Sequence, residues 1–514
     1  MQSPAFVLRL RQLVPSDRRL AAAVLLGTLL VYAVFLVRHT GGVAGGSDSS
    51  GYLNQARILA GGTLQTAVRT IEGVPPTPEA GFLYVPLGFS PVPDAPAWMR
   101  PTYPAGLSLL VCAAAPLVGW DHAPVVVLIL HTLAGLLLTY ALARHLELSP
   151  GWALAAVLLL AASPLYVFMG TQPMSDVPAL VWITGAVLAA ERSRTKTAWA
   201  SLAGFAFAGA VLLRPTNLIL ILPVALALGG DLRRWVRFAV GGLPGALFHF
   251  RYAEVAYGSW LATGYGDVSE LFRAELLGPT LRHYVQWLPQ LFSPLVLLVI
   301  GLPWLLRQHF RRALLLLLWF GSVAGLYAVY EFTHHTWWFL RFLLPSAPAL
   351  LIGALWVARA AASRLPSSLP HGWLGGALLA AAVVLLVSTN RRLHAHLSAE
   401  QEQMYADAAR WAQSTLPADA VVLAMQTSGA LLYYTDLTFV RWDMASPELA
   451  ARIVKTCHQR GQPLYALLFP FEQEAALERF GGTGWQRLAE FDQVAAWRWM
   501  PEGASKPPGS TAER

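Results

Sequence analysis

Long apolar runs alternate with short polar connections over most of this chain. The runs lie at 20–37, 104–119, 123–143, 152–170, 177–191, 198–213, 216–229, 236–250, 290–306, 313–330, 342–361 and 372–389. Most approach the length of about 20 residues that a helix needs to cross the hydrocarbon layer. The pattern predicts a polytopic α-helical membrane protein.

Beyond residue 390 the pattern changes, because charged residues return and the apolar runs shorten to strand length. The three short runs are Val421–Met425, Leu464–Phe469 and Val494–Trp499. Ser446-Pro447-Glu448 is typical of a helix start, with Ser as the cap and Pro at the first position. We therefore expect a membrane domain at 1–389, a small α/β domain at 390–500 and a disordered tail at 501–514.

The composition agrees with a membrane protein: 55% of the 514 residues are hydrophobic, 13% are charged and the mean hydropathy is +0.48. The net charge of +8 does not indicate nucleic acid, because the basic residues form short clusters between apolar runs. These clusters are Arg9–Arg19, Arg192–Lys196, Arg233–Arg237, Arg307–Arg312 and Arg359–Arg364. Such clusters are typical of cytoplasmic loops.

The basic clusters also limit the number of spans. If all twelve runs crossed, Arg192–Lys196 and Arg307–Arg312 would lie outside, against the positive-inside rule. The run 104–119 is short and interrupted by Pro116, so we expect it to dip into the outer leaflet. About eleven spans remain, with the first run as an uncleaved anchor and the N-terminus in the cytoplasm.

This arrangement gathers polar features on the outer side. They are the loop 38–122 with its juxtamembrane helices, Asp48, Arg100, Asp176, Arg214, the loops 251–289 and 331–341, and the segment 390–514. An acid where a span leaves the bilayer, as at Asp48, is costly to hold and well placed for acid/base chemistry.

Five short fragments, in this order, lie on that side. They are Ser47-Asp48-Ser49 with Tyr52-Leu53-Asn54-Gln55-Ala56, Arg100-Pro101-Thr102-Tyr103-Pro104-Ala105-Gly106, Met174-Ser175-Asp176-Val177-Pro178, Leu213-Arg214-Pro215-Thr216-Asn217 and Arg341-Phe342-Leu343-Leu344-Pro345. Over about the first 360 residues the chain resembles the GT-C glycosyltransferases, in the bacterial branch related to protein O-mannosyltransferases and to the aminoarabinose transferase of lipid A.

The resemblance implies an inverting glycosyltransferase, a hexosyl- or pentosyltransferase, at the outer face of the bacterial cytoplasmic membrane. Its donor would be a sugar on a polyprenyl phosphate, and its acceptor a glycan, a lipid or a protein. Such a reaction needs a base for the acceptor hydroxyl and cations for the departing phosphate. Nucleic acid is not an expected partner.

By resemblance Asp48 is the catalytic base and Asp176 the second acid, which in relatives helps to hold a metal or to position the acceptor. Both acids also suit a helix cap, Asp48 before Tyr52 and Asp176 before Pro178. Asp48 could be both the catalytic base and a helix cap.

Three arginines are candidates to bind the donor phosphate: Arg214, Arg341 and Arg100. Guanidinium can clamp phosphate oxygens with two hydrogen bonds. Arg214 could instead snorkel to lipid headgroups, and Arg341 could anchor its helix beside an aromatic belt. Arg100 stands where a related transferase carries a lysine, which keeps the charge but changes the geometry.

The candidate residues of the acceptor or substrate pocket are Tyr52, Tyr103, His334, His335, Trp338 and Tyr265. His334 and His335 with Glu331 suggest metal ligands, but adjacent histidines point apart on regular elements. They also suit an outer loop near the acceptor, and Trp338 also suits an aromatic belt. The sequence establishes no cofactor and leaves a divalent metal open.

Two other functions compete with a transferase. A lipid or sugar transporter or flippase would also have many spans, but we find no internal repeat and no ionisable residues through the span centres. The third is a non-catalytic membrane protein of glycan assembly that retained the scaffold.

Overall fold

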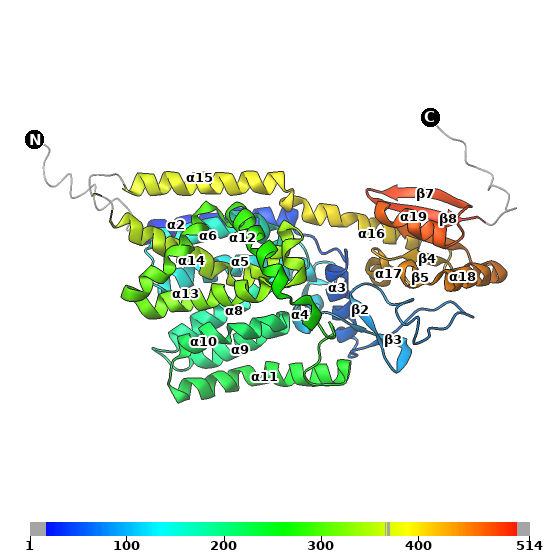
Figure 1. Ribbon diagram of the computed structural model, residues 1–514, viewed down its shortest axis with the longest axis horizontal. Coiled ribbons are helices and arrows are strands. Elements are labelled where there is room, and N and C mark those ends of the chain that lie inside the picture. The colour runs from blue at the N-terminus through cyan, green and yellow to red at the C-terminus, as the bar shows by residue number, and fades with distance from the viewer. Residues whose placement is uncertain (1–16, 365, 367–370, 501–514) are drawn as a thin grey trace, which may run out of the picture.

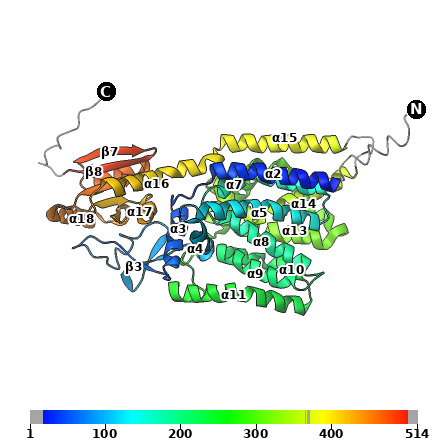
Figure 2. The same cartoon turned by 180° about the vertical axis from the view of Figure 1, so that it is seen from behind.

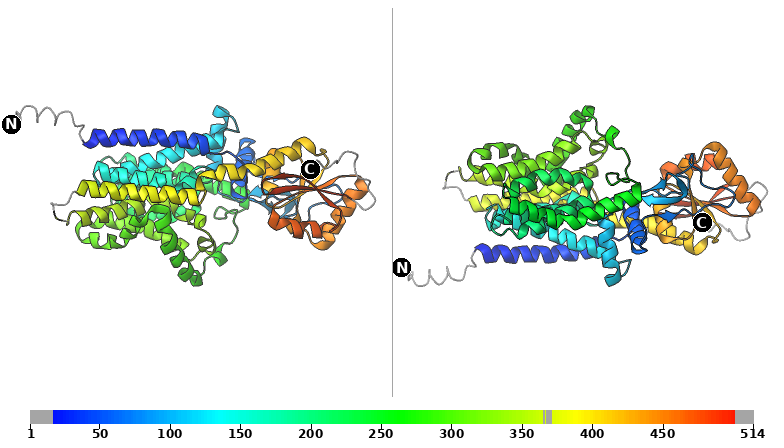
Figure 3. Two further views of the ribbon diagram at one scale, coloured as in Figure 1. Left: turned by 90° about the horizontal axis from the view of Figure 1, so that it is seen from above. Right: turned by 90° about the horizontal axis from the view of Figure 1, so that it is seen from below.

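The computed structural model describes residues 17–364, 366 and 371–500. A bundle of helices forms one part of the molecule, and a β-sheet with its own helices forms the other (Figure 1). Helix α15 (His371–Arg392) runs along the bundle and is followed by α16 (Ser398–Thr415), which leads into the sheet. The views from above and below show the sheet extending beyond one end of the bundle (Figure 3).

The bundle is built mainly from residues before 393. Its helices are α2 (Asp17–His39), α3 (Asp48–Ala60), α4 (Ala105–Val118), α5 (Ala123–His145), α6 (Pro150–Ala162), α7 (Pro164–Gly170), α8 (Asp176–Arg192), α9 (Trp199–Leu213), α10 (Ile221–Leu228), α11 (Leu232–Tyr257), α12 (Leu277–Phe292), α13 (Leu306–Tyr327), α14 (Ala347–Ala362) and α15. The main 3-10 segments are η1 (Pro215–Leu220), η4 (Pro294–Leu305), η5 (Glu331–His334) and η6 (Trp337–Ser346). Helix α11 lies on the opposite side of the bundle from α15 (Figures 1 and 2).

Fewer helices are long enough to cross a membrane than the sequence predicts. Five apolar helical stretches in the described residues are long enough to cross a membrane: Arg19–His39, Ala123–His145, Pro294–Tyr327, Trp337–Ala362 and Trp373–Arg392. The bent pair α6 and α7 would make a sixth. Helices α4 and α9 and the stretch Pro215–Leu228 are apolar but shorter. Length and composition therefore do not confirm the expected number of about eleven.

Prolines explain two places where an apolar run is not one straight helix. The run 152–170 bends by 62° between α6 and α7, where Ser163 precedes Pro164. Proline has no N–H to continue the hydrogen-bond ladder, and its ring disfavours a helical residue before it. The Ser163 hydroxyl accepts from the Tyr166 N–H and so caps α7. Arg214 is likewise extended before Pro215, with φ −147° and ψ 109°, and separates α9 from η1.

Helices α9 and α11 pack through small residues. A Cβ added at Gly204 would overlap the Phe238 carbonyl oxygen, and one added at Gly241 would overlap the Ser201 carbonyl oxygen. The two backbones therefore touch, which is how small residues allow helices in membranes to associate closely.

Two sheets lie outside the helix bundle. The first is three-stranded, in the order β1 (Thr66–Ala67), β3 (Ala95–Pro101) and β2 (Phe89–Val92), and it is antiparallel. It belongs to the long connection between α3 and α4.

The C-terminal sheet has five strands in the order β5-β4-β6-β8-β7. Its elements are β4 (Val421–Ala424), α17 (Ser428–Tyr434), β5 (Thr438–Arg441), α18 (Pro447–Arg460), β6 (Leu464–Leu468), α19 (Pro470–Arg479), β7 (Trp485–Phe491) and β8 (Val494–Trp499). Strands β4, β5 and β6 are parallel, while β8 and β7 are antiparallel to their neighbours.

The sequence located three of these five strands, and β5 and β7 were missed. The expected helix start is confirmed, because α18 begins at Pro447 and the Ser446 hydroxyl accepts from the Leu449 N–H at 3.2 Å. The expected disordered tail 501–514 lies outside the described residues, as do Arg9 and Arg11 of the N-terminal basic cluster.

The C-terminal segment contacts the bundle through α17 and α3. The Asn54 side-chain amide donates to the Ser50 and Gly429 carbonyls, each at 2.9 Å. Arg57 donates to the Tyr433 carbonyl at 2.6 Å and lies over the ring of that tyrosine. A Cβ on Gly429 would overlap the Ser50 hydroxyl, so the two helices are in direct contact.

The packing of α9 against α11 predicts that Gly241→Val lowers the free energy of unfolding by roughly 1–3 kcal/mol, because the new side chain would force the backbones apart. Gly321→Val is the control, since a Cβ at Gly321 meets no atom within 4 Å. Thermal unfolding of both purified variants in detergent measures the effect. Equal unfolding midpoints would show that the close contact is not needed for stability.

Candidate active site

Two ion pairs bring together four residues that are far apart in the sequence. Asp48 Oδ2 lies 2.7 Å from Arg341 Nη2, and Asp176 Oδ1 lies 2.7 Å from Arg214 Nη2. The acids stand in the first turns of α3 and α8, Arg214 at the break between α9 and η1, and Arg341 within η6. All four line one cavity.

The cavity has a volume of about 480 Å³ and two kinds of lining residue. The polar residues are the two ion pairs with Tyr52, Tyr103, Ser175 and Thr216. The apolar and aromatic residues, which we call the aromatic wall, are Val268, Leu271, Phe272, Tyr327, Tyr330, Phe332, Phe339 and Phe342. The remaining lining residues are Pro104, Met174, Leu213, Pro215, Thr263 and Tyr265. A ligand with an anionic head and an apolar body would match both kinds of residue.

Neither acid is used as a side-chain helix cap. The N-cap residues are Ser47 and Ser175, and neither makes a side-chain capping hydrogen bond. Asp48 and Asp176 follow as the first helical residues and pair with arginines. Their negative charges also lie at the positive ends of the two helix dipoles.

Asp48 is accessible, whereas Asp176 is not. The Asp48 side chain is 25% exposed and that of Asp176 is 0% exposed. Burial alone would raise the pKa of Asp48, but the charge of Arg341 and hydrogen bonds from Tyr103 and Arg341 outweigh it and hold the pKa below its usual value. Asp48 is therefore an ionised carboxylate at neutral pH that can receive a proton from an incoming group.

Tyrosine and serine hydroxyls surround the two pairs. The Tyr103 hydroxyl lies 2.7 Å from the Ser47 hydroxyl, and burial and the charge of Asp48 raise its pKa, so it stays protonated. The Tyr52 hydroxyl lies 3.0 Å from the Ser175 hydroxyl, which also accepts from Arg214 Nε at 3.4 Å. These contacts fix the orientation of the charged groups.

Several polar atoms of the site have no hydrogen-bond partner within the part of the chain that the structure describes. They are both carboxylate oxygens of Asp176, Nη1 of Arg214 and Nε of Arg341. The Asp176–Arg214 contact balances charge without good hydrogen-bond geometry. Buried polar groups are normally satisfied, so these atoms have hydrogen-bonding capacity for a ligand.

The structure places seven of the eleven candidate site residues on the cavity: Asp48, Asp176, Arg214, Arg341, Tyr52, Tyr103 and Tyr265. Arg100, His334, His335 and Trp338 do not line it. Arg100 instead donates to the Ala256 carbonyl at 3.0 Å and lies over the Tyr257 ring.

The aromatic wall was missed from the sequence. Tyr327 and Tyr330 lie at the end of one predicted span, and Phe342 begins another. Aromatic residues in such apolar runs indicated only a packed core. Phe342 lies 5.4 Å from the Arg214 guanidinium carbon and 5.5 Å from that of Arg341, measured to the ring centre. The position of Phe342 directly after Arg341 was the one sequence signal that could have indicated its place in the site.

His335 Nε2 lies 3.8 Å from Glu331 Oε1, and Glu331 also pairs with Arg273. In the described ranges, no group of three or more His, Cys, Asp or Glu side chains is placed to hold a metal ion.

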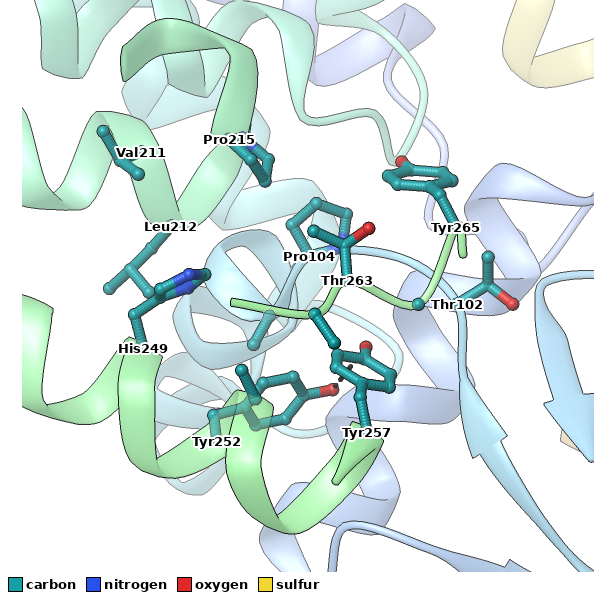
Figure 4. Close-up of a pocket in the computed structure, with 14 residues that line it drawn as sticks. Thr102, Pro104, Val211, Leu212, Pro215, His249, Tyr252, Tyr257, Thr263 and Tyr265 are labelled. Atoms are coloured by element: carbon teal, nitrogen blue, oxygen red, sulfur yellow. Dashed lines mark hydrogen bonds between the residues drawn. The ribbon is translucent and has the colours of Figure 1, made fainter. Parts of the chain in front are cut away.

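A small pocket next to the cavity shows how the loop after α11 is held. Figure 4 shows Tyr252 and Tyr257 of α11 facing each other, with their hydroxyls 3.5 Å apart. Tyr252 also accepts from the Gln55 amide at 2.7 Å, and Tyr257 donates to the Pro101 carbonyl at 3.0 Å. The pocket shares Thr263 and Tyr265 with the large cavity. These contacts tie the end of α11, from which the loop begins, to α3 and to the connection before α4.

Both the sequence and the fold are similar to those of known proteins. The model of the dolichyl-phosphate-mannose-protein mannosyltransferase family matches residues 113–251, about a quarter of the chain. No curated protein sequence matched.

Among solved structures, ArnT from Cupriavidus metallidurans bound to undecaprenyl phosphate is similar, with a TM-score of 0.60 at 14% identity, covering 95% of this chain and 99% of ArnT. The Archaeoglobus fulgidus oligosaccharyltransferase tethered to an acceptor peptide has a TM-score of 0.53 at 12% identity, covering 89% of this chain and 71% of the other.

The archaeal oligosaccharyltransferase AglB from the same organism, in complex with an inhibitory peptide and a dolichol-phosphate, has a TM-score of 0.51 at 12% identity over 89% of this chain and 70% of AglB. At these identities the likeness establishes the fold. The resemblance found in the sequence is thereby confirmed, and the chain has the fold of the GT-C membrane glycosyltransferases.

Proposed function

We propose that this protein is an inverting glycosyltransferase that moves a sugar from a polyprenyl phosphate to an acceptor at the outer face of a bacterial cytoplasmic membrane. The observation that carries the proposal is the pairing of two carboxylates with two guanidinium groups in a cavity that is also lined by aromatic residues. The transferred sugar is a hexose or a pentose, and the acceptor is a glycan, a lipid or a protein.

The donor phosphate would bind between Arg214 and Arg341. Arg214 Nη1 and Arg341 Nε have no hydrogen-bond partner among the described residues and are buried. Guanidinium groups bind phosphate oxygens through charge-assisted hydrogen bonds. ArnT of the same fold was solved with undecaprenyl phosphate, and AglB with a dolichol-phosphate, so lipid phosphates bind proteins of this fold.

Asp48 would act as the base, since it is the accessible one of the two acids. The acceptor hydroxyl oxygen forms a bond to the anomeric carbon, its proton passes to Asp48, and the bond between that carbon and the phosphate oxygen breaks. The polyprenyl phosphate leaves with the electron pair, and the arginines stabilise its charge.

Arg341 would couple the binding of the donor phosphate to the basicity of Asp48. Without a ligand its charge lowers the pKa of Asp48 and makes the carboxylate a weak base. A phosphate that binds Arg341 would share that charge and so raise the basicity of Asp48. Asp48 would therefore become a better base when the donor is in place.

Asp176 would hold Arg214 at the donor phosphate. It is fully buried and pairs with Arg214, while its two oxygens keep hydrogen-bonding capacity. These oxygens suit sugar hydroxyls of the donor or the acceptor.

We also propose the membrane arrangement that the basic clusters suggest. About eleven spans, including short helices such as α9, with α4 dipping into the outer leaflet without crossing, would keep Arg192–Lys196 and Arg307–Arg312 in the cytoplasm. The cavity and the α/β domain at 390–500 would then face the exterior together, because Asp48 at the start of α3 lines the cavity and α3 lies beside α17 at one end of the bundle (Figure 1).

Asp48→Asn is expected to lower the rate of sugar transfer by roughly 100- to 10,000-fold, the range for loss of general base catalysis. The full-length protein in lipid vesicles is supplied with a set of undecaprenyl-phosphate sugars and a membrane extract as the acceptor source. Mass spectrometry measures the release of undecaprenyl phosphate. Asp436→Asn, on a side chain that is 96% exposed, is the matched control. Full transfer by Asp48→Asn would remove Asp48 from the base role.

Arg214→Lys is expected to weaken binding of undecaprenyl phosphate roughly tenfold, because lysine keeps the charge but not the two-pronged geometry. Arg100→Lys is the control, since Arg100 lies outside the cavity and should leave affinity unchanged. Titration of each variant with the lipid in detergent gives the dissociation constants. A larger loss in Arg100→Lys than in Arg214→Lys would place the phosphate elsewhere.

A further inference from the structure

One buried carboxyl near the cavity has no part in the proposed reaction. Glu402 lies on α16, the helix that leads from the bundle into the C-terminal sheet. Its side chain is half-buried, and Oε2 is fully buried without a hydrogen-bond partner. A Cβ added at Gly45 would overlap this oxygen, so the carboxyl is packed directly against the Gly45 backbone.

The backbone that Glu402 contacts leads directly to Asp48. The Gly45 carbonyl accepts from the Ser50 N–H at 3.1 Å, and the Gly46 carbonyl accepts from the Ser50 hydroxyl. Gly46 has a φ of +49°, a conformation that favours glycine. The loop 45–47 and the first turn of α3 are thus hydrogen-bonded as one unit. A shift at Gly45 would therefore move the Asp48 carboxylate relative to Arg341.

The surroundings of Glu402 favour its neutral form. The loop 40–47 contributes no charged side chain. Tyr405, which is on α16 like Glu402, lies beside Gly45. The charged group that faces Glu402 from α3 is Asp48. Among the described residues no lysine or arginine balances the carboxyl. The hydroxyl of the neighbouring Tyr405 faces the carboxyl of Glu472 and accepts a hydrogen bond from the Gln426 side-chain amide at 3.2 Å. Burial, and then the negative charge of Asp48, raise the pKa of Glu402 to about 7.

We propose that Glu402 is a positioning residue for Asp48, whose neutral carboxyl holds the Gly45–Gly46 backbone in place and whose ionisation weakens the site. The role in catalysis rests on the proposed function, whereas the contact and its effect on the cavity do not. Loss of the proton places a second negative charge near Asp48 and against a backbone that offers it no hydrogen bond. The C-terminal segment would in this way control the base from outside the cavity.

The sign of the pH effect follows from the direction of the pKa shift. The folded protein keeps the Glu402 proton between pH 4.5 and about 7, where the unfolded chain loses it. The contribution of this group to stability therefore falls as the pH rises through that window and is constant above it. In Glu402→Gln the side chain stays neutral, so this contribution to the pH dependence disappears.

The first test compares wild type, Glu402→Gln and Glu400→Gln as full-length proteins in detergent, with undecaprenyl phosphate as the probe. Between pH 6 and pH 8.5, wild type should lose roughly threefold more affinity than Glu402→Gln, because ionised Glu402 repels the phosphate. Glu400 is exposed on the same helix, so Glu400→Gln should follow wild type. Identical pH profiles for wild type and Glu402→Gln would overturn the proposal.

The second test uses the contact itself. Gly45→Ala should push the Glu402 carboxyl away and lower kcat for sugar transfer about tenfold with a smaller change in KM, as expected when a base is misplaced. Because Glu402→Ala removes the same contact, Gly45→Ala combined with Glu402→Ala should be no more impaired than Glu402→Ala alone. A double variant whose loss of rate is the full product of the two single losses would overturn the proposal, since the two residues would then act independently.

The two tests separate this proposal from the transferase assignment. If no sugar is transferred, the pH profile of undecaprenyl phosphate binding still decides whether Glu402 acts on the cavity. If Asp48→Asn abolishes transfer while Glu402→Gln leaves both the pH profile and the rate unchanged, the transferase assignment stands and the role of Glu402 falls.

Discussion

The structure of the site depends on the charge balance between two carboxylates and two guanidinium groups in a poorly solvated cavity. Each of these groups would be costly to bury alone, and each is within 2.7 Å of an opposite charge. The pairs join the start of α3 to η6 and the start of α8 to the break after α9. Four segments that are distant in sequence are thereby held in one arrangement, and the cavity is the space that they enclose.

The two pairs are not equivalent, and the difference is the basis for the roles that we propose for them. Asp176 is fully buried, and its partner Arg214 is 12% exposed, so this pair is a fixed part of the wall. Asp48 is a quarter exposed and pairs with Arg341. A group that must exchange a proton with an incoming hydroxyl needs such access. This is why we propose the buried pair for binding a ligand and the more exposed pair for the reaction with it.

Much of the site could be predicted from the sequence, because its charged residues interrupt apolar runs. A charged residue at the end of a span is costly unless it has a partner or a function. This rule drew attention to four residues on one side of the membrane: Asp48, Asp176, Arg214 and Arg341. The aromatic wall could not be found in this way, since tyrosine and phenylalanine in an apolar run equally indicate a core. The number of spans stays a prediction, because only five or six helical stretches among the described residues meet the length and composition of a span, and the hydrogen-bond ladder is broken at prolines such as Pro164 and Pro215.

Contacts between the bundle and the C-terminal segment were also beyond sequence reasoning, because they depend on backbone groups and on shapes. Asn54 and Gln55 are adjacent on α3 and are satisfied by different parts of the molecule, Asn54 by the Gly429 carbonyl of α17 and Gln55 by the Tyr252 hydroxyl of α11. Both side chains are buried, so losing either partner would leave a polar group unpaired.

Helix α3 is therefore fixed from both sides, by the helix bundle and by the C-terminal segment. Because Asp48 is the first residue of α3, its position relative to Arg341 depends on both contacts. Misplacing a reacting group by about 1 Å can cost 100-fold in rate. A segment without any residue on the cavity wall can thus affect the position of Asp48, through the contact of its helix α17 with α3.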